Sequence, residues 1–155
     1  MSKLLAPTRG GEASYPNQDK AIALAKERGD ELVFLYITDI SFLDHHSAPV
    51  LLNLEEELDE MGAFLLAMAQ ERAARVGIEA EAIVRRGYFN DVLKDVITEM
   101  GMCCVVLGSP ETDTGLTTLE YLHELAEDIA VTQNAETIVL DKGEIVFQHG
   151  PGNRG

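Results

Sequence analysis

The sequence has no long apolar run, and this shortage excludes a membrane-spanning protein. No stretch of the 155 residues reaches the roughly 18 consecutive apolar residues that a transmembrane helix needs. Near the N-terminus only residues 4–6 are consecutively apolar, which is too short for the core of a signal peptide. We therefore expect a cytoplasmic protein with no membrane partner.

Basic residues are also scarce. The chain carries 12 Lys and Arg against 27 Asp and Glu, for a formal net charge of −15. The densest basic pair is Arg85-Arg86, and no larger basic cluster exists. Most faces of such a protein repel a phosphate backbone, so we expect no nucleic-acid partner.

Cysteine and histidine offer little metal or redox chemistry. Cys103 and Cys104 are neighbours that face opposite sides of a strand and lack the C-x-x-C spacing, so we predict two small buried side chains. His45 and His46 follow Asp44 in a loop, and His123 and His149 stand isolated. We interpret these four histidines as solvated side chains and predict no metal site.

The pattern that is present is a strict alternation of strands and helices. Apolar or alternating runs predict strands over residues 3–8, 31–37, 78–87 and 102–109, and a hairpin over 136–147 turns at Gly143. The intervening segments predict helices over 15–28, 53–76, 90–100 and 117–133. The whole of 1–147 is predicted to form one domain, followed by a flexible tail over 148–155.

Several local signals refine these helices. Ser14 or Asn17 is expected to cap the first helix, Asn53 the second and Asn90 the third, and Thr117 with Glu120 forms a capping box for the fourth. One continuous apolar face of the second helix is expected from the 4-3-4-3 spacing of Leu54, Leu58, Met61, Leu65 and Met68. We expect that face to pack on a sheet.

Alternation of this kind indicates a parallel sheet covered by helices on both faces, which is a three-layer α/β sandwich. The strand over 102–109 is apolar throughout, so we place it at the centre of the sheet. The strand over 78–87 alternates between apolar and charged residues and is expected at an edge.

The order and spacing of these segments resemble the universal stress protein family from residue 3 to 140. The resemblance is carried by "LLAPTRGGEAS", "LVFLYITD", "GIEAEAIVRRGYFNDVLKDVI", "CVVLGS" and "ETIVL". It implies a five-stranded parallel sheet in the order 3-2-1-4-5, here with an antiparallel hairpin strand added at the C-terminus. It also implies dimerisation through the fifth strand and, in some members, binding of ATP.

A nucleotide pocket in such a family member lies at the ends of the first, second and fourth strands. The residues of this chain that match those positions are Pro7, Thr8, Arg9, Ile37, Leu107, Gly108, Ser109 and Glu111. Gly108 matches the first glycine of the family's phosphate loop, and Pro7, Thr8 and Ile37 match the pocket wall.

The phosphate side of this pocket departs from the family pattern. Glu111 stands where the resemblance implies a second glycine, and Asp113 follows it. A carboxylate about 4 Å from a phosphate costs about 4 kcal/mol at an effective dielectric constant near 20. Arg9 replaces the acidic residue that ends the first strand in ATP-binding members, and the Gly-Ser pair further on is missing. The sequence therefore predicts a degenerate loop and no cofactor.

Three functions remain open at this stage. We favour a non-catalytic regulatory or interaction module that forms a homodimer, does not bind ATP and has a regulatory protein partner. The alternative is a stress sensor that binds ATP with magnesium through an altered phosphate loop, and the third is a weak nucleotide hydrolase. The predicted dimer interface lies on the last hairpin, at Ile138, Val139, Leu140, Ile145, Val146 and Phe147.

Overall fold

The computed structural model describes residues 2–9, 12–39, 48–109 and 119–150. Its strands are β1 (Lys3–Pro7), β2 (Glu31–Asp39), β3 (Glu81–Gly87), β4 (Cys104–Gly108), β5 (Glu136–Asp141) and β6 (Glu144–His149). Its helices are a short 3-10 turn (Glu12–Ser14), α1 (Tyr15–Arg28), α2 (Ala48–Ala74), α3 (Phe89–Met100) and α4 (Leu119–Thr132).

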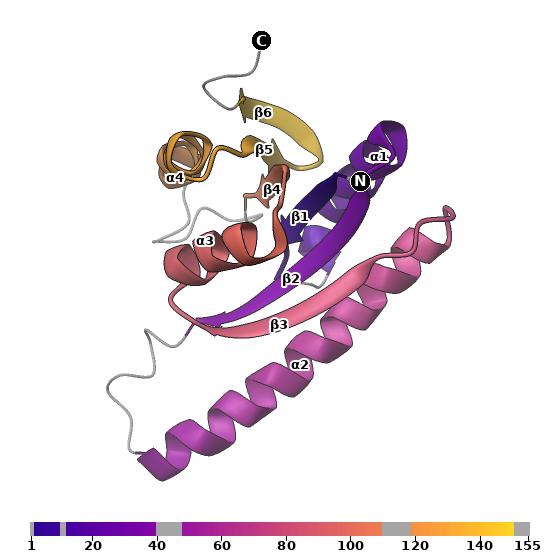
Figure 1. The fold of residues 1–155 in the computed structure, drawn as a ribbon. Helices are drawn as coiled ribbons and strands as arrows, with labels where there is room; N and C mark the ends of the chain where they lie inside the picture. The colour runs from indigo at the N-terminus through magenta and orange to yellow at the C-terminus, as the bar shows by residue number, and fades with distance from the viewer. Residues whose placement is uncertain (1, 10–11, 40–47, 110–118, 151–155) are drawn as a thin grey trace.

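All six strands join one sheet in the order β3-β2-β1-β4-β5-β6 (Figure 1). The first five pair in parallel, and β6 pairs with β5 in the antiparallel direction. This arrangement confirms the predicted α/β class, the strand order 3-2-1-4-5 and the C-terminal antiparallel strand.

The helices cover both faces of the sheet and bury two separate cores. α1 and α2 cover one face, and α3 and α4 cover the other (Figure 1). Successive residues of the central strands point to opposite cores, as a strand requires. Val106 belongs to the α1–α2 core and Val105 to the α3–α4 core, so β4 is buried on both faces as predicted.

The ends of the sheet also follow from the sequence pattern. β3 lies at one edge as predicted, and none of its residues is fully buried. It begins at Glu81, three residues after the predicted start, and Ile78 and Ala80 pack against the core from the preceding loop. At the other edge, β5 and β6 form the predicted hairpin.

The hairpin turn consists of Lys142 and Gly143, both with positive φ, at 52° and 82°. Two consecutive left-handed residues make the two-residue turn that suits the twist of antiparallel strands, which confirms the role predicted for Gly143. β6 continues through Gln148 and His149, so these two residues belong to the sheet and not to a tail.

The caps and start of the second helix differ from the prediction. α2 begins at Ala48, five residues before Asn53, so Asn53 lies inside the helix and does not cap it. Asn90 lies inside α3, whose cap position is Tyr88, and Asn17 lies inside α1, whose cap position is Ser14. Thr117 lies outside the described residues.

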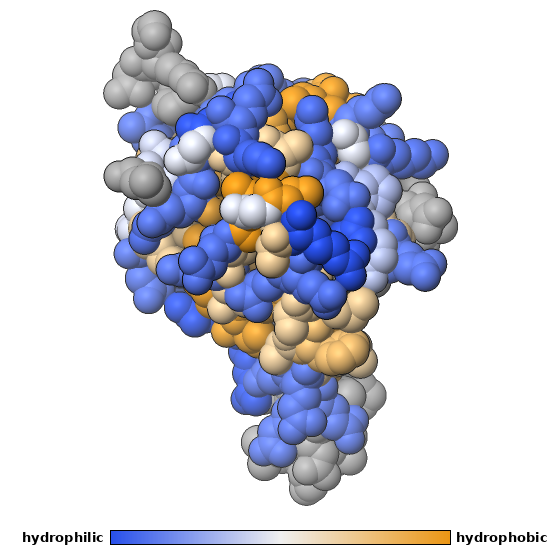
Figure 2. Space-filling view, turned by 90° about the vertical axis from the view of Figure 1, so that its right-hand side faces the viewer, coloured by the Kyte–Doolittle hydropathy of each residue, from blue (hydrophilic) through white to orange (hydrophobic). Residues whose placement is uncertain are grey.

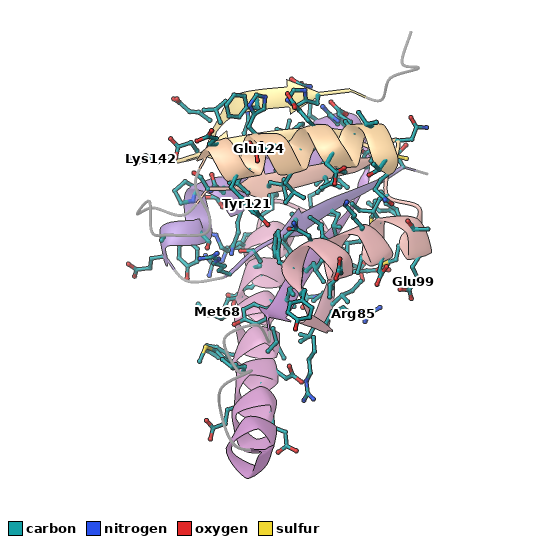
Figure 3. The ribbon with its side chains drawn as sticks, turned by 90° about the vertical axis from the view of Figure 1, so that its left-hand side faces the viewer. Met68, Arg85, Glu99, Tyr121, Glu124 and Lys142 are labelled. Carbon is teal, nitrogen blue, oxygen red and sulfur yellow. The ribbon has the colours of Figure 1, made fainter. Side chains whose placement is uncertain are left out.

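The apolar face of α2 was also predicted wrongly. Met61 is 51% exposed, and Leu58, Leu65 and Met68 are only partly buried. The residues of α2 that are buried against the sheet form the neighbouring row of the helix, which consists of Gly62, Leu66, Ala69 and Ala73. Small residues there let the helix approach the sheet closely, and the N-terminal part of α2 projects past the sheet (Figure 3).

We expect Gly62→Ala to reduce the free energy of unfolding by roughly 1–2 kcal/mol. A Cβ at Gly62 would lie 2.4 Å from Cδ1 of the Tyr36 ring on β2, which overpacks the contact. Helix propensity alone would give the opposite sign, since alanine is favoured over glycine by up to about 1 kcal/mol. Urea unfolding measures the change, and the same substitution in a Tyr36→Ala background should be neutral or stabilising. A gain in stability in the otherwise wild-type chain would contradict this packing.

One side of the molecule is predominantly polar (Figure 2). Figure 2 shows hydrophilic residues over most of one side of the molecule, with smaller hydrophobic areas between them. None of the described helices combines the length and the apolar character that crossing a bilayer would take.

Candidate functional site

The candidate site lies where the direction of strand succession reverses, between β1 and β4. These two strands are parallel neighbours, paired at Leu4↔Cys104 and Leu5↔Val105. In open α/β sheets, ligands bind outside the carboxyl ends of the strands at such a point. Pro7, Thr8 and Gly108 lie there together and line one cavity, as the sequence predicted.

Gly108 is covered by a side chain from α1. The amide nitrogen of Asn17 lies 2.7 Å from the place where a Cβ would stand at Gly108. Asn17 Nδ2 donates to the carbonyl oxygen of Ser109 at 3.3 Å, and its Oδ1 accepts from the backbone N–H of Gly143 at 2.8 Å. Asn17 therefore ties α1, the end of β4 and the hairpin turn together, directly above the glycine expected to approach a phosphate.

The hydroxyl of Ser109 is engaged by a carboxylate. Ser109 Oγ donates to Asp141 Oδ1 at 2.7 Å, and the Ser109 N–H donates to the carbonyl oxygen of Leu140 at 2.9 Å. Two donors that could meet a phosphate are thus used within the protein, and Asp141 adds a negative charge next to them. This arrangement disfavours an anionic ligand at the end of β4.

The cavities that the described residues form here are small. The one at Thr8, Gln18 and Gly108 has about 20 Å³, which is room for about one water molecule. A second, of about 120 Å³, is lined by Glu12, Ala13, Pro16, Asn17, Ser109, Asp141 and Lys142. Its lining carries two acidic residues and one basic residue.

The other predicted pocket residues are separated by the structure. Leu107 is 1% exposed and belongs to the α3–α4 core, and Ile37 packs against that same core, so neither joins the cavity at Gly108. Arg9 is exposed just after β1. Glu111 and Asp113 lie outside the described residues, as do His45 and His46.

Two residues of this site were missed by the sequence interpretation. The sequence predicts a candidate helix cap at Asn17 and assigns no role to Asp141. Their partners are distant in sequence, since 126 residues separate Asn17 from Gly143 and 32 separate Asp141 from Ser109. The only local signal is that β5 ends in a polar residue, Asp141, at the carboxyl edge, where binding residues gather.

A second polar cluster lies at the opposite, amino end of the sheet. Arg28 donates to both carboxylate oxygens of Glu136, at 2.6 and 3.2 Å, and Glu136 is only 4% exposed. Gln148 Nε2 donates to the same carboxylate at 2.8 Å, and Arg28 also contacts Cys104 Sγ at 3.7 Å. The bond to Glu136 raises the pKa of Arg28. The cluster joins α1, β5 and β6.

The two cysteines differ in exposure, which corrects the prediction that both are buried. Cys103 is exposed and Cys104 is buried. Burial, reinforced by the nearby Glu136 carboxylate, raises the pKa of the Cys104 thiol to about 12. The folded protein therefore holds Cys104 as a thiol, and only Cys103 is open to reagents.

We expect one thiol per chain to react with an aromatic disulfide reagent at pH 8, and two after unfolding in urea. Only about 1 in 10,000 Cys104 side chains is a thiolate at that pH, given its pKa of about 12. Cys103→Ser should reduce the native count to zero, and a native count of two would contradict the burial of Cys104.

The same shift predicts a loss of stability in alkali. The folded pKa of Cys104 lies above its ordinary value of 9.0, so the unfolded chain releases this proton first. The stability contribution is full below about pH 9 and is lost as pH rises towards about 12, with a slope of up to about 1.4 kcal/mol per pH unit. In Cys104→Ala this part of the slope should disappear, which urea unfolding across that pH range measures.

A doubly wound α/β sandwich with a site at the β1/β4 switch point is the class that this fold defines. The sequence matches the universal stress protein family over residues 1–139, and the chain belongs to that family. It is 29% identical over 120 residues to universal stress protein YxiE of Bacillus subtilis, covering 70% of this chain and 79% of YxiE.

Solved structures share the fold at lower identity. Universal stress protein UspA from Lactobacillus plantarum superposes with a TM-score of 0.69 at 17% identity, covering 90% of this chain and 96% of its own. A universal stress protein in complex with cAMP gives 0.55 at 20% identity, covering 90% and 94%. A family member from Arabidopsis thaliana with AMP bound gives 0.57 at 14% identity, covering 91% and 92%.

Proposed function

We propose that this universal stress protein is a non-catalytic interaction module that forms a homodimer and does not bind ATP. The observation that supports the homodimer is the open edge of β6. β6 is the last strand of the sheet, so one row of its backbone groups has no neighbouring strand among the described residues. Ile145 and Val146 on this strand are 39% and 42% exposed.

The structure leaves only some of the predicted dimer-interface residues accessible to a partner. Ile138 and Leu140 are fully buried in the α1–α2 core and Val139 in the α3–α4 core, so they offer no side chain to a partner. Ile145 and Val146 remain accessible, and Phe147 is partly buried against the α3–α4 core. Antiparallel pairing of two β6 strands across a twofold axis would close both sheet edges at once.

Lysine substitutions on the β6 edge test whether the dimer forms through this strand. We expect the wild-type chain to sediment as a dimer and the Ile145→Lys/Val146→Lys variant as a monomer, because lysines on an edge strand oppose pairing. The matched control is Val76→Lys/Val131→Lys, which adds the same charge at two other exposed valines and should stay dimeric. A monomeric wild-type chain, or an unchanged dimer in the β6 variant, would refute the β6 interface.

The second part of the proposal, that the chain does not bind ATP, rests on the contacts above Gly108. Asn17 covers Gly108, and the Ser109 hydroxyl donates its hydrogen bond to the Asp141 carboxylate. The triphosphate of ATP would have to displace the Asn17 side chain from Gly108. The negative charge of the Asp141 carboxylate beside Ser109 would repel it. Among the described residues at this edge we identify no nucleophile, base or metal cluster, and we assign no catalytic residue. The regulatory protein partner and the cytoplasmic location stay predictions.

Nucleotide sensing is the second candidate, and one observation favours it. Structural neighbours have been solved in complex with cAMP, dAMP and AMP. Each of these carries a single phosphate, which brings less negative charge than ATP to the Asp141 side of the site. If this chain binds a nucleotide, a monophosphate therefore fits better than ATP with magnesium.

A further inference from the structure

We propose that His123, Glu127 and His149 form a binding site for a divalent transition-metal ion, with zinc as the best match. His123 and Glu127 lie on α4, and His149 is the last residue of β6. The ligand atoms of the three side chains all lie within 4.8 Å of one another. The prediction of isolated, solvated histidines is therefore wrong for His123 and His149.

The fold brings the three groups together from two elements. His123 and Glu127 are four residues apart on a helix, so they share one face, and His123 Nε2 lies 3.3 Å from Glu127 Oε1. The hairpin returns β6 beside α4 and stacks the two imidazoles at 5.0 Å between centroids. The ring of Phe147 stacks against His123 at 4.0 Å and holds it in place.

One imidazole nitrogen in this group lacks a hydrogen-bond partner among the described residues. Nε2 of His149 is buried and has no hydrogen-bond partner among the described residues. A buried polar atom without a partner is costly, and a neutral imidazole nitrogen is a strong ligand for a metal ion. An ion at the edge of the stacked rings, in line with the in-plane lone pair of this nitrogen, would satisfy it.

The donor set selects the kind of ion. Two imidazoles and one carboxylate suit zinc, and the set leaves a fourth tetrahedral position open. Ligand atoms about 2.1 Å from a tetrahedral ion lie about 3.4 Å apart, so ligand atoms that are now up to 4.8 Å apart would have to approach by up to about 1.4 Å. The net charge of −15 favours a cation at this surface.

Zinc binding to the untagged full chain tests the site. The background carries His45→Asn, His46→Asn and Cys103→Ser, which removes the two other histidines and the exposed thiol as ligands. Zinc is titrated in competition with a chromophoric chelator, and cobalt absorption reports tetrahedral coordination. We expect one ion per chain with micromolar affinity.

Single variants in that background assign the ligands. His123→Phe keeps an aromatic ring on Phe147, so folding is preserved, and it should weaken zinc binding by at least about 10-fold, as should His149→Phe and Glu127→Gln. Glu124→Gln changes a neighbouring carboxylate on α4 (labelled in Figure 3) and should bind like the background chain. Circular dichroism checks the fold of each variant.

Three results would overturn the proposal. The background chain could fail to bind zinc at millimolar concentration, or both histidine variants could bind as tightly as Glu124→Gln. Binding that is present in the wild-type chain and lost in the background would instead assign zinc to His45, His46 or Cys103.

Discussion

Arg28→Ala lowers the free energy of unfolding by about 3 kcal/mol. The reason is the carboxylate that the substitution leaves behind. Glu136 is 4% exposed, and Arg28 donates to both of its carboxylate oxygens. Without Arg28 the carboxylate stays buried and loses its cationic partner, while the bond from Gln148 remains.

Two further variants separate this effect from a general loss of charge. Arg75→Ala breaks the exposed Arg75–Glu71 pair, whose side chains are both 66% exposed, and should cost less than about 0.5 kcal/mol. Adding Glu136→Gln to Arg28→Ala removes the buried charge and should restore part of the stability. Urea unfolding measures all three, and equal effects of Arg28→Ala and Arg75→Ala would mean that the pair at the amino end of the sheet contributes little.

Asn17→Leu is expected to cost about 2–4 kcal/mol. It removes both hydrogen bonds of the Asn17 side chain and leaves the Gly143 N–H and the Ser109 carbonyl without that partner. Each polar group left unsatisfied in a partly buried place costs about 1–3 kcal/mol. The amide of Gly143 should also exchange with solvent faster, because its acceptor is gone.

The neighbouring residue provides the control. Gln18 is more deeply buried than Asn17; its Nε2 donates to Thr8 Oγ1 at 3.0 Å, but its Oε1 has no hydrogen-bond partner among the described residues. Gln18→Met keeps the volume and removes one hydrogen bond together with one unsatisfied oxygen, so it should change stability by less than about 1 kcal/mol. If the two substitutions cost the same, the bonds of Asn17 do not hold the carboxyl edge together.

The sheet could be predicted from the sequence because its signals are local. The unbroken apolar run at β4 means burial on both faces, the alternation at β3 means an edge, and Gly143 marks a hairpin turn. α2 could not be oriented this way, because the large apolar side chains form one stripe and the small residues that touch the sheet form another. Gly62, Leu66, Ala69 and Ala73 carry the correct 4-3-4 spacing, but three of the four are small residues, and a pattern based on large apolar side chains does not select them.

The site was harder to predict, because its decisive contacts join residues that are far apart in sequence. The resemblance predicts Pro7, Thr8 and Gly108 at neighbouring strand ends, and the structure brings them to one cavity there, since strand ends follow from the fold. The bonds of Asn17 to Ser109 and Gly143 depend on how α1 lies over β4 and the hairpin, and no local pattern encodes that. The stack of His123 on Phe147 and His149 likewise depends on the return of β6 beside α4.

Calorimetric titration of the purified wild-type chain with ATP, with and without magnesium at moderate salt, tests the central claim most directly. The contacts of Asn17 above Gly108 and of Ser109 with Asp141 predict no heat of binding and no thermal shift up to millimolar ATP. Micromolar binding would contradict the account and make this chain a nucleotide sensor, with Arg9 as the first residue to substitute.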